Sequence, residues 1–292
     1  MRSPRPSNSA TTTKRSITLI AIWVVIATAV GGFAAAAILT SNRHADAYAL
    51  CQSSGLKAAA TTMVMVDATD AFTEDQRRRL KSTVEVERER LPEGGRLIIV
   101  SLNPDAAWEP TELVSVCNPG KGETANPLLV TRSKVEKRWQ SVYGDPIDKA
   151  VQQSVDRGAS ERSPIIITLA ALLARADFDT RVAGRRLVII SDLLEHEKGI
   201  YSQLRGGDFW GAYQASPLPK SARLDLRNVS VAIDYLQRGK FAGIQGPRHQ
   251  AFWERLLKEA GANEVTFLGM SASTALPAQA RSELTSSQNG RR

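Results

Sequence analysis

The chain has few of the residues from which most metal centres and disulfide scaffolds are built. Its 292 residues include only two cysteines and three histidines. Two thiols exclude a four-thiolate zinc site and a disulfide-dense fold, although they allow a single bridge. The sequence also has no G-x-S-x-G, H-E-x-x-H or glycine-rich phosphate loop, so the common motifs of hydrolases, metalloproteases and nucleotide-binding proteins are missing.

Acidic residues are absent from the first 45 positions. The whole chain carries 38 basic and 30 acidic residues, which gives a formal net charge of +8. Five of the basic residues lie in this N-terminal segment, so the other 33 nearly balance the 30 acids. A basic chain often binds nucleic acid. Here most of the excess charge is a feature of the N-terminus, and we predict no nucleic-acid partner.

An uncharged run of 23 residues, Ile17–Leu39, follows four basic residues, Arg2, Arg5, Lys14 and Arg15. Roughly 20 helical residues cross a bilayer. The positive-inside rule then predicts a single-pass anchor in a bacterial-type inner membrane, with the N-terminus in the cytoplasm and the main domain in the periplasm. The alternative is a signal peptide cleaved near residues 34–36, although the run is longer than the usual apolar region of such peptides. Both alternatives place the bulk of the chain outside the cytoplasm.

Composition divides the chain into five segments. We predict a cytoplasmic segment (1–15), a transmembrane helix (16–40), a connector (41–58), a folded domain (59–270) and a disordered tail (271–292). In the folded domain, short apolar runs alternate with amphipathic stretches, which is typical of an α/β fold with a mostly parallel, doubly wound sheet. The predicted strands are Thr61–Val66, Arg96–Leu102, Leu113–Val116, Leu187–Ser191, Asn228–Tyr235 and Glu264–Leu268. The predicted helices start at Thr73, Ser133, Ile165 and Pro247, and the second is broken at Gly144-Asp145-Pro146.

Polar side chains follow two of the buried strands. Asp67, Thr69 and Asp70 come after the first strand, and Asp192 directly follows the strand that ends in LVIIS. Ser163 stands at a predicted helix start. Sites in open parallel sheets form beyond the carboxyl ends of the strands, where the strand order reverses, so we expect these side chains to converge. Carboxylates and hydroxyls without clustered Cys or His favour a hard divalent cation such as Mg²⁺.

This order of elements resembles the von Willebrand factor A-like (integrin inserted-domain-like) family. The family's metal-ion-dependent adhesion site has a D-x-S-x-S motif after the first strand, a threonine before a later helix and a distal aspartate. The resemblance implies that Asp67 and Thr69 take the first and third motif positions. It also implies that Ser163 replaces the threonine and that Asp192 is the distal aspartate. Ala71 departs from the pattern, because it stands where the second hydroxyl is expected; Asp70 or Thr73 could compensate.

Each of these residues also has a plain structural interpretation. Thr73 and Gln76 form a T-x-x-Q capping box, and Asp70 could cap the same helix. Ser163, followed by Pro164, has the pattern of a helix N-cap. His196 lies four residues after Asp192 and would share its face on a helix, although an exposed histidine is the simpler interpretation. His249 is expected to be exposed.

Cys51 and Cys117 are predicted to form a disulfide. Both lie on the exported side of the predicted anchor, and an even number of cysteines in an oxidising compartment favours pairing. A catalytic thiol is the alternative, but no histidine neighbours either residue in the sequence.

The sequence therefore predicts a membrane-anchored, extracytoplasmic protein-interaction module of a cell-envelope complex, with a divalent cation such as Mg²⁺ as its candidate cofactor. Its expected partners are another envelope protein or a second copy of the chain. The alternative is a metal-dependent hydrolase of phosphates or esters that uses Asp67, Asp70, Asp192 and His196. The sequence does not identify the partner.

Overall fold

The computed structural model describes residues 23–32, 48–53, 57–121, 131–156 and 160–268. Residues 23–32, within the predicted anchor, are helical. The rest of that segment, the predicted cytoplasmic segment 1–15 and the predicted tail 271–292 lie outside the described residues. Among the helices that are described, none is both long and apolar enough to cross a membrane.

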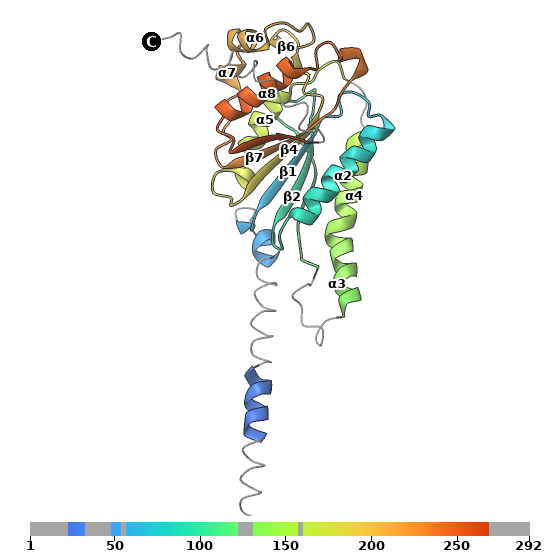
Figure 1. Cartoon of the computed structure of the whole chain (residues 1–292), viewed down its shortest axis with the longest axis vertical. Coiled ribbons are helices and arrows are strands. Elements are labelled where there is room, and N and C mark those ends of the chain that lie inside the picture. The colour runs from blue at the N-terminus through green and yellow to red at the C-terminus, as the bar shows by residue number, and fades with distance from the viewer. Residues whose placement is uncertain (1–22, 33–47, 54–56, 122–130, 157–159, 269–292) are drawn as a thin grey trace, which may run out of the picture.

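A six-stranded sheet forms the centre of the domain and confirms the predicted α/β fold (Figure 1). The strand order is β3-β2-β1-β4-β7-β8. The edge strand β3 is antiparallel to β2, and all other neighbours are parallel. This is the doubly wound arrangement, and its order reverses between β1 and β4. The strands are β1 (Thr61–Val66), β2 (Arg96–Ser101), β3 (Thr111–Cys117), β4 (Arg185–Ser191), β7 (Val229–Tyr235) and β8 (Glu264–Phe267).

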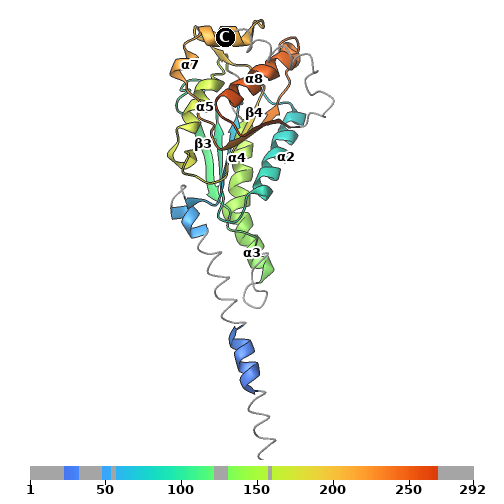
Figure 2. The ribbon, with the colours of Figure 1, turned by 60° about the vertical axis from the view of Figure 1, so that its left-hand side comes forward.

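Helices cover both faces of the sheet because its central strands are apolar on both sides. In β1, Met63 and Met65 pack with α5 and α8, whereas Val64 and Val66 pack with α2 and α4. Figure 2 shows these layers from a second direction. The helices are α2 (Glu74–Arg90), α3 (Arg132–Trp139), α4 (Asp145–Val155), α5 (Ile165–Leu173), α6 (Phe209–Ala215), α7 (Leu218–Ser221) and α8 (Pro247–Glu259). Shorter elements are the π-helix η2 (Gln140–Gly144), the 3₁₀ turns η3 (Ala176–Phe178) and η4 (Gly239–Phe241), and the hairpin strands β5 (His196–Glu197) and β6 (Tyr201–Ser202).

The predicted break at Gly144 is wrong. α3, η2 and α4 are continuous in the chain, and the backbone N–H of Asp145 bonds to the carbonyl of Gln140 across the π turn. Pro146 has no N–H to donate, and the wider π turn before it lets the chain remain helical. Tyr143 in the π turn and Ile147 in α4 are buried in the same cluster. Core packing therefore carries the helix through residues that favour a break.

The predicted disulfide between Cys51 and Cys117 is confirmed. It joins helical residues 48–53 to the last residue of β3, and the guanidinium of Arg96 donates to the Cys51 carbonyl at 2.8 Å. Arg96 is the first residue of β2. The N-terminal part of the chain is thus attached to the amino end of the parallel strands.

Candidate functional site

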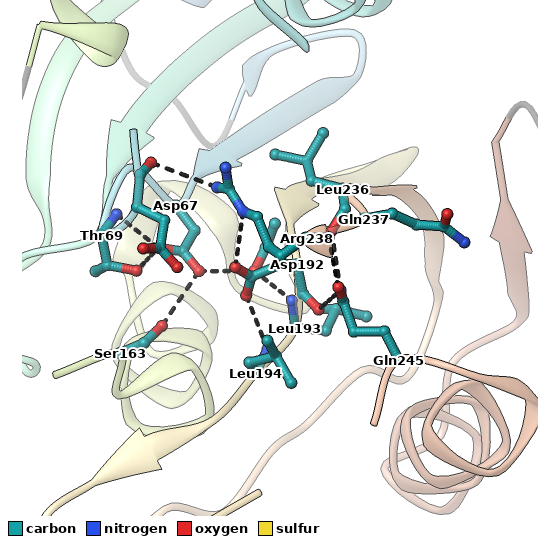
Figure 3. A network of polar contacts seen from close by, with 12 residues as sticks. Asp67, Thr69, Ser163, Asp192, Leu193, Leu194, Leu236, Gln237, Arg238 and Gln245 are labelled. Carbon is teal, nitrogen blue, oxygen red and sulfur yellow. Dashed lines mark hydrogen bonds and ion pairs between the residues drawn. The ribbon is translucent and has the colours of Figure 1, made fainter. Parts of the chain in front are cut away.

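The four principal residues predicted from the sequence meet at one end of the sheet (Figure 3). Asp67 directly follows β1, and Asp192 directly follows β4. These are the two strands between which the strand order reverses. Thr69 lies in the loop after β1, and Ser163 lies two residues before α5. All four are buried. The topology of the sheet therefore brings together residues up to 125 positions apart.

Asp67 is the centre of this cluster and accepts four hydrogen bonds. Its Oδ1 accepts from the backbone N–H of Thr69 at 3.1 Å and from the Thr69 hydroxyl at 2.6 Å. Its Oδ2 accepts from the hydroxyls of Ser163 at 3.2 Å and of Ser191 at 2.7 Å. A carboxylate has about four lone-pair sites, so Asp67 is fully occupied by neutral donors of the protein.

Asp192 has a different environment because it contacts a cation. Its Oδ1 accepts from the backbone N–H of Leu194 at 2.9 Å, and its Oδ2 accepts from Nε of Arg238 at 3.1 Å. Burial, together with the negative charge of Asp67, raises the pKa of Asp192 to about 7, against the opposing effect of Arg238. Of these two buried carboxylates, Asp192 is the one that contacts a guanidinium.

Arg238 was not predicted from the sequence. Beyond Asp192, its Nη1 donates to the Ala71 carbonyl at 2.7 Å and to Oε1 of Gln76 at 3.1 Å, and its Nη2 donates to the Asp70 carbonyl at 3.4 Å. The only sequence signal was its place, three residues after β7, at the same end of the sheet. A buried guanidinium thus contacts the loop in which Ala71 stands where the resemblance implied a second hydroxyl.

Gln245 holds the backbone around this ion pair. Its Oε1 accepts from the backbone N–H of Arg238 at 2.6 Å. Its Nε2 donates to the carbonyls of Asp192 and Leu236, each at 2.9 Å. Ser191, also missed by the sequence analysis, accepts from the backbone N–H of Leu193 at 2.8 Å while it donates to Asp67. Both residues fix the loops that carry the charged groups.

An open pocket of about 480 Å³ lies over these residues. Five of the predicted site residues line it, namely Thr69, Asp70, Ser163, Asp192 and His196. At its rim, Nζ of Lys240 pairs with Oδ1 of Asp70 at 2.9 Å. The remaining lining residues are Ser160, Glu161, Leu194, Leu204 and Phe241.

The predicted role of Ser163 as a helix N-cap is wrong. The N-cap position of α5 is Pro164, and it makes no side-chain cap. Instead, the buried carboxyl of Glu195 accepts from the backbone N–H of Ile166 at 2.8 Å. Burial raises the pKa of Glu195 well above its ordinary value. A distant residue thus caps the helix, and the Ser163 hydroxyl instead donates to Asp67.

Two histidines lie in environments that the sequence patterns did not indicate. His196 is not on a helix with Asp192; it lies in β5, where its Nδ1 is 2.9 Å from the Ser202 hydroxyl and its backbone pairs with Ser163. His249 is fully buried, not exposed, and its Nδ1 is 2.7 Å from the Tyr235 hydroxyl. Burial lowers the pKa of His249 to about 4. The first turn of α8 faces the core here, which a position near a helix start does not reveal.

Thr73 acts as the predicted cap and lies outside the pocket. Its hydroxyl accepts from the backbone N–H of Gln76 at 3.3 Å, and the Gln76 side chain accepts from the Thr73 backbone at 3.1 Å. Both halves of the capping box are therefore present. Asp70 does not cap the helix but pairs with Lys240.

The arrangement does not fit the divalent cation that the family resemblance implies. Asp67 has no lone pair left for a metal, Ala71 supplies no hydroxyl, and a fixed cation already contacts Asp192. Within the described parts of the chain, no group of three or more His, Cys, Asp or Glu side chains is placed to hold a metal ion. A divalent cation could use only the remaining lone pairs of Thr69, Ser163 and Asp192, and it would lie beside the guanidinium of Arg238.

Comparison of the chain with models of protein families and with curated proteins finds no match. The geometry of the pocket therefore carries the functional interpretation.

Proposed function

We propose that this protein is a membrane-anchored interaction module of a cell-envelope complex, with a von Willebrand factor A-like domain outside the cytoplasm. Its binding surface is the pocket over β1 and β4. The observation that carries the proposal is the convergence of Thr69, Ser163 and Asp192 on one open pocket, with Asp67 beneath them, at the reversal of the strand order. Ligands of open α/β sheets bind at this position.

The direction of the pocket supports a role away from the membrane. The disulfide attaches the N-terminal part of the chain to the amino end of the parallel strands. The pocket lies at their carboxyl end. With the N-terminal apolar run as an anchor, the pocket is on the side of the domain farthest from the attachment, where another envelope protein or a second copy of the chain can reach it.

The geometry favours binding over the alternative metal-dependent hydrolysis. A hydrolase needs a base or a metal-activated water next to the substrate. Asp67 has no free lone pair to act as a base, and Asp192 is paired with Arg238. His196 interacts through Nδ1 with Ser202. The polar groups of the site hold one another in place, which suits recognition of a ligand.

Site-specific photo-crosslinking in growing cells tests the proposal. A photo-reactive amino acid replaces Glu161, which is exposed at the pocket rim, or Ala59, which is exposed just before β1 at the opposite end. We expect a discrete adduct from position 161 of the full-length chain and little or none from position 59. Equal adducts from both positions, or none from position 161, would contradict the pocket as the binding surface.

A further inference from the structure

The floor of the pocket consists of the side chains of Thr69, Ser163 and Asp192, and it offers hydrogen-bond acceptors. A hydroxyl has one O–H to donate and two lone pairs. The O–H groups of Thr69 and Ser163 both donate to Asp67, so only their lone pairs are left for a ligand. The carboxylate of Asp192 accepts one bond at each oxygen and keeps acceptor capacity. Because Asp67 accepts both O–H groups, the floor favours ligands that donate hydrogen bonds.

When Asp192 is ionised, the three buried charged groups beneath the pocket lack one positive unit. Asp67 and Asp192 are both buried carboxylates, and the guanidinium of Arg238 contacts Asp192. A single monovalent cation in the pocket would balance the three groups. A divalent cation would leave an excess positive charge beside the guanidinium of Arg238.

Apolar side chains also contribute to the pocket. Leu194, Leu204 and Phe241 line it together with the polar floor. Lysine and arginine combine a long aliphatic stem with a charged end that only donates hydrogen bonds. Such a side chain places its stem against these residues and its charged end on the acceptor floor.

We propose that the pocket binds a lysine or arginine side chain of a partner protein directly, without a bridging metal ion. This inference rests on the proposed function and specifies the chemistry of the partner. Arg238 takes part as the fixed cation of the site, and the partner supplies the second one. The ammonium group of Lys240, which also lines the pocket, pairs with Asp70, so its charge is already partnered.

Ligand-observed saturation-transfer NMR on the detergent-solubilised full chain tests the inference. The probes are Nα-acetyl-arginine amide, Nα-acetyl-lysine amide and the uncharged, equally long Nα-acetyl-norleucine amide. We expect saturation of at least one cationic probe and little of the norleucine probe. Millimolar MgCl₂ should compete no better than NaCl of equal ionic strength. Equal saturation of all three probes, or specific displacement by Mg²⁺, would overturn the inference.

Two variants of Thr69 serve as a matched pair. Thr69→Ser keeps the hydroxyl that donates to Asp67, so it should bind the cationic probe like the wild type. Thr69→Val keeps the shape but removes the acceptor, so binding should weaken by about tenfold, as for the loss of one charge-assisted hydrogen bond. Should Thr69→Val fail to fold, Asp192→Asn removes the charge at nearly constant shape and should give the same loss. Unchanged binding in the folded variant would overturn the inference.

The experiment separates this inference from the proposed function. An adduct from position 161 in cells together with no binding of cationic probes would retain the binding surface and reject its cationic ligand. Binding of the probes without an adduct would retain the chemistry of the pocket and reject the envelope partner.

Discussion

At the scale of single residues, Asp67 determines what the pocket can recognise. Its carboxylate is buried and makes no ion pair of its own among the described residues. Three hydroxyls and one backbone N–H satisfy it, and the hydroxyls of Thr69 and Ser163 are thereby fixed as donors. An aspartate that touches no ligand would thus control the polarity of the residues that do.

Removing one of these donors should destabilise the domain. Ser191→Ala deletes the hydroxyl that lies 2.7 Å from Oδ2 of Asp67, and leaves a buried carboxylate short of one hydrogen bond. We expect the free energy of unfolding to fall by about 1–3 kcal/mol. Urea titration followed by circular dichroism measures this change. Ser230→Ala, the same substitution at a half-buried position of β7, is the control and should have a much smaller effect.

The buried His249 should make the domain sensitive to acid. Its pKa is lowered to about 4 by burial, whereas in the unfolded chain it is about 6.5. The unfolded state therefore takes up a proton first, and the stabilising contribution of the neutral ring is lost as the pH falls from about 6.5 toward 4. The whole loss is about 3 kcal/mol.

The raised pKa values of Asp192, Glu195 and Asp234 act in the opposite direction. A comparison of the wild type with His249→Gln isolates the histidine, because these acids titrate in both proteins. As the pH falls, the unfolding free energy of the wild type should decrease relative to that of the variant. A difference that is independent of pH would contradict the assignment.

At the scale of elements, the sequence predicted what local patterns determine. The apolar run Thr61–Val66 is β1 with the same bounds, and the T-x-x-Q pattern is the cap of α2. Local sequence patterns gave the wrong structure where residues far away in the sequence determine it. Glu195 caps α5 in place of Ser163, and core packing carries the chain through the π turn before Pro146.

In the candidate site, too, local patterns predicted some residues, and contacts between distant residues hid others. Asp67, Thr69 and Asp192 were predicted because they lie within three residues of the end of a recognisable buried strand. Arg238 was missed because its partner Asp192 is 46 residues away, and the loop after β7 has no pattern that indicates which side chain turns inward. Short-range patterns thus locate the ends of strands, whereas the contacts that neutralise buried charge depend on tertiary structure.

The disulfide should stabilise the edge of the sheet. It joins residues 66 positions apart, and a bridge that closes a loop of this length contributes about 2–4 kcal/mol. The double variant Cys51→Ser/Cys117→Ser should unfold at a correspondingly lower urea concentration. Alkylation without reductant should modify neither cysteine of the wild type. Modification of both thiols in the unreduced protein would contradict the bridge.

At the scale of the whole molecule, the pocket and the attachment of the N-terminal chain lie at opposite ends of the sheet. The proposed anchor predicts that the full-length protein stays in the membrane pellet after an alkaline carbonate wash. A variant that lacks residues 1–40 should be soluble when it is exported by a separate signal peptide. Release of the full-length protein by the wash would contradict the anchor. It would also remove the basis for placing the pocket on the side of the domain away from the membrane.

The central claim is that the pocket over β1 and β4 binds a partner. The most direct measurement is the yield of the adduct from a photo-reactive amino acid at position 161, compared between wild type, Thr69→Ser and Thr69→Val in the same cells at equal expression. We predict a similar yield in the wild type and Thr69→Ser, and a several-fold lower yield in Thr69→Val. Equal yields in all three proteins would contradict the claim.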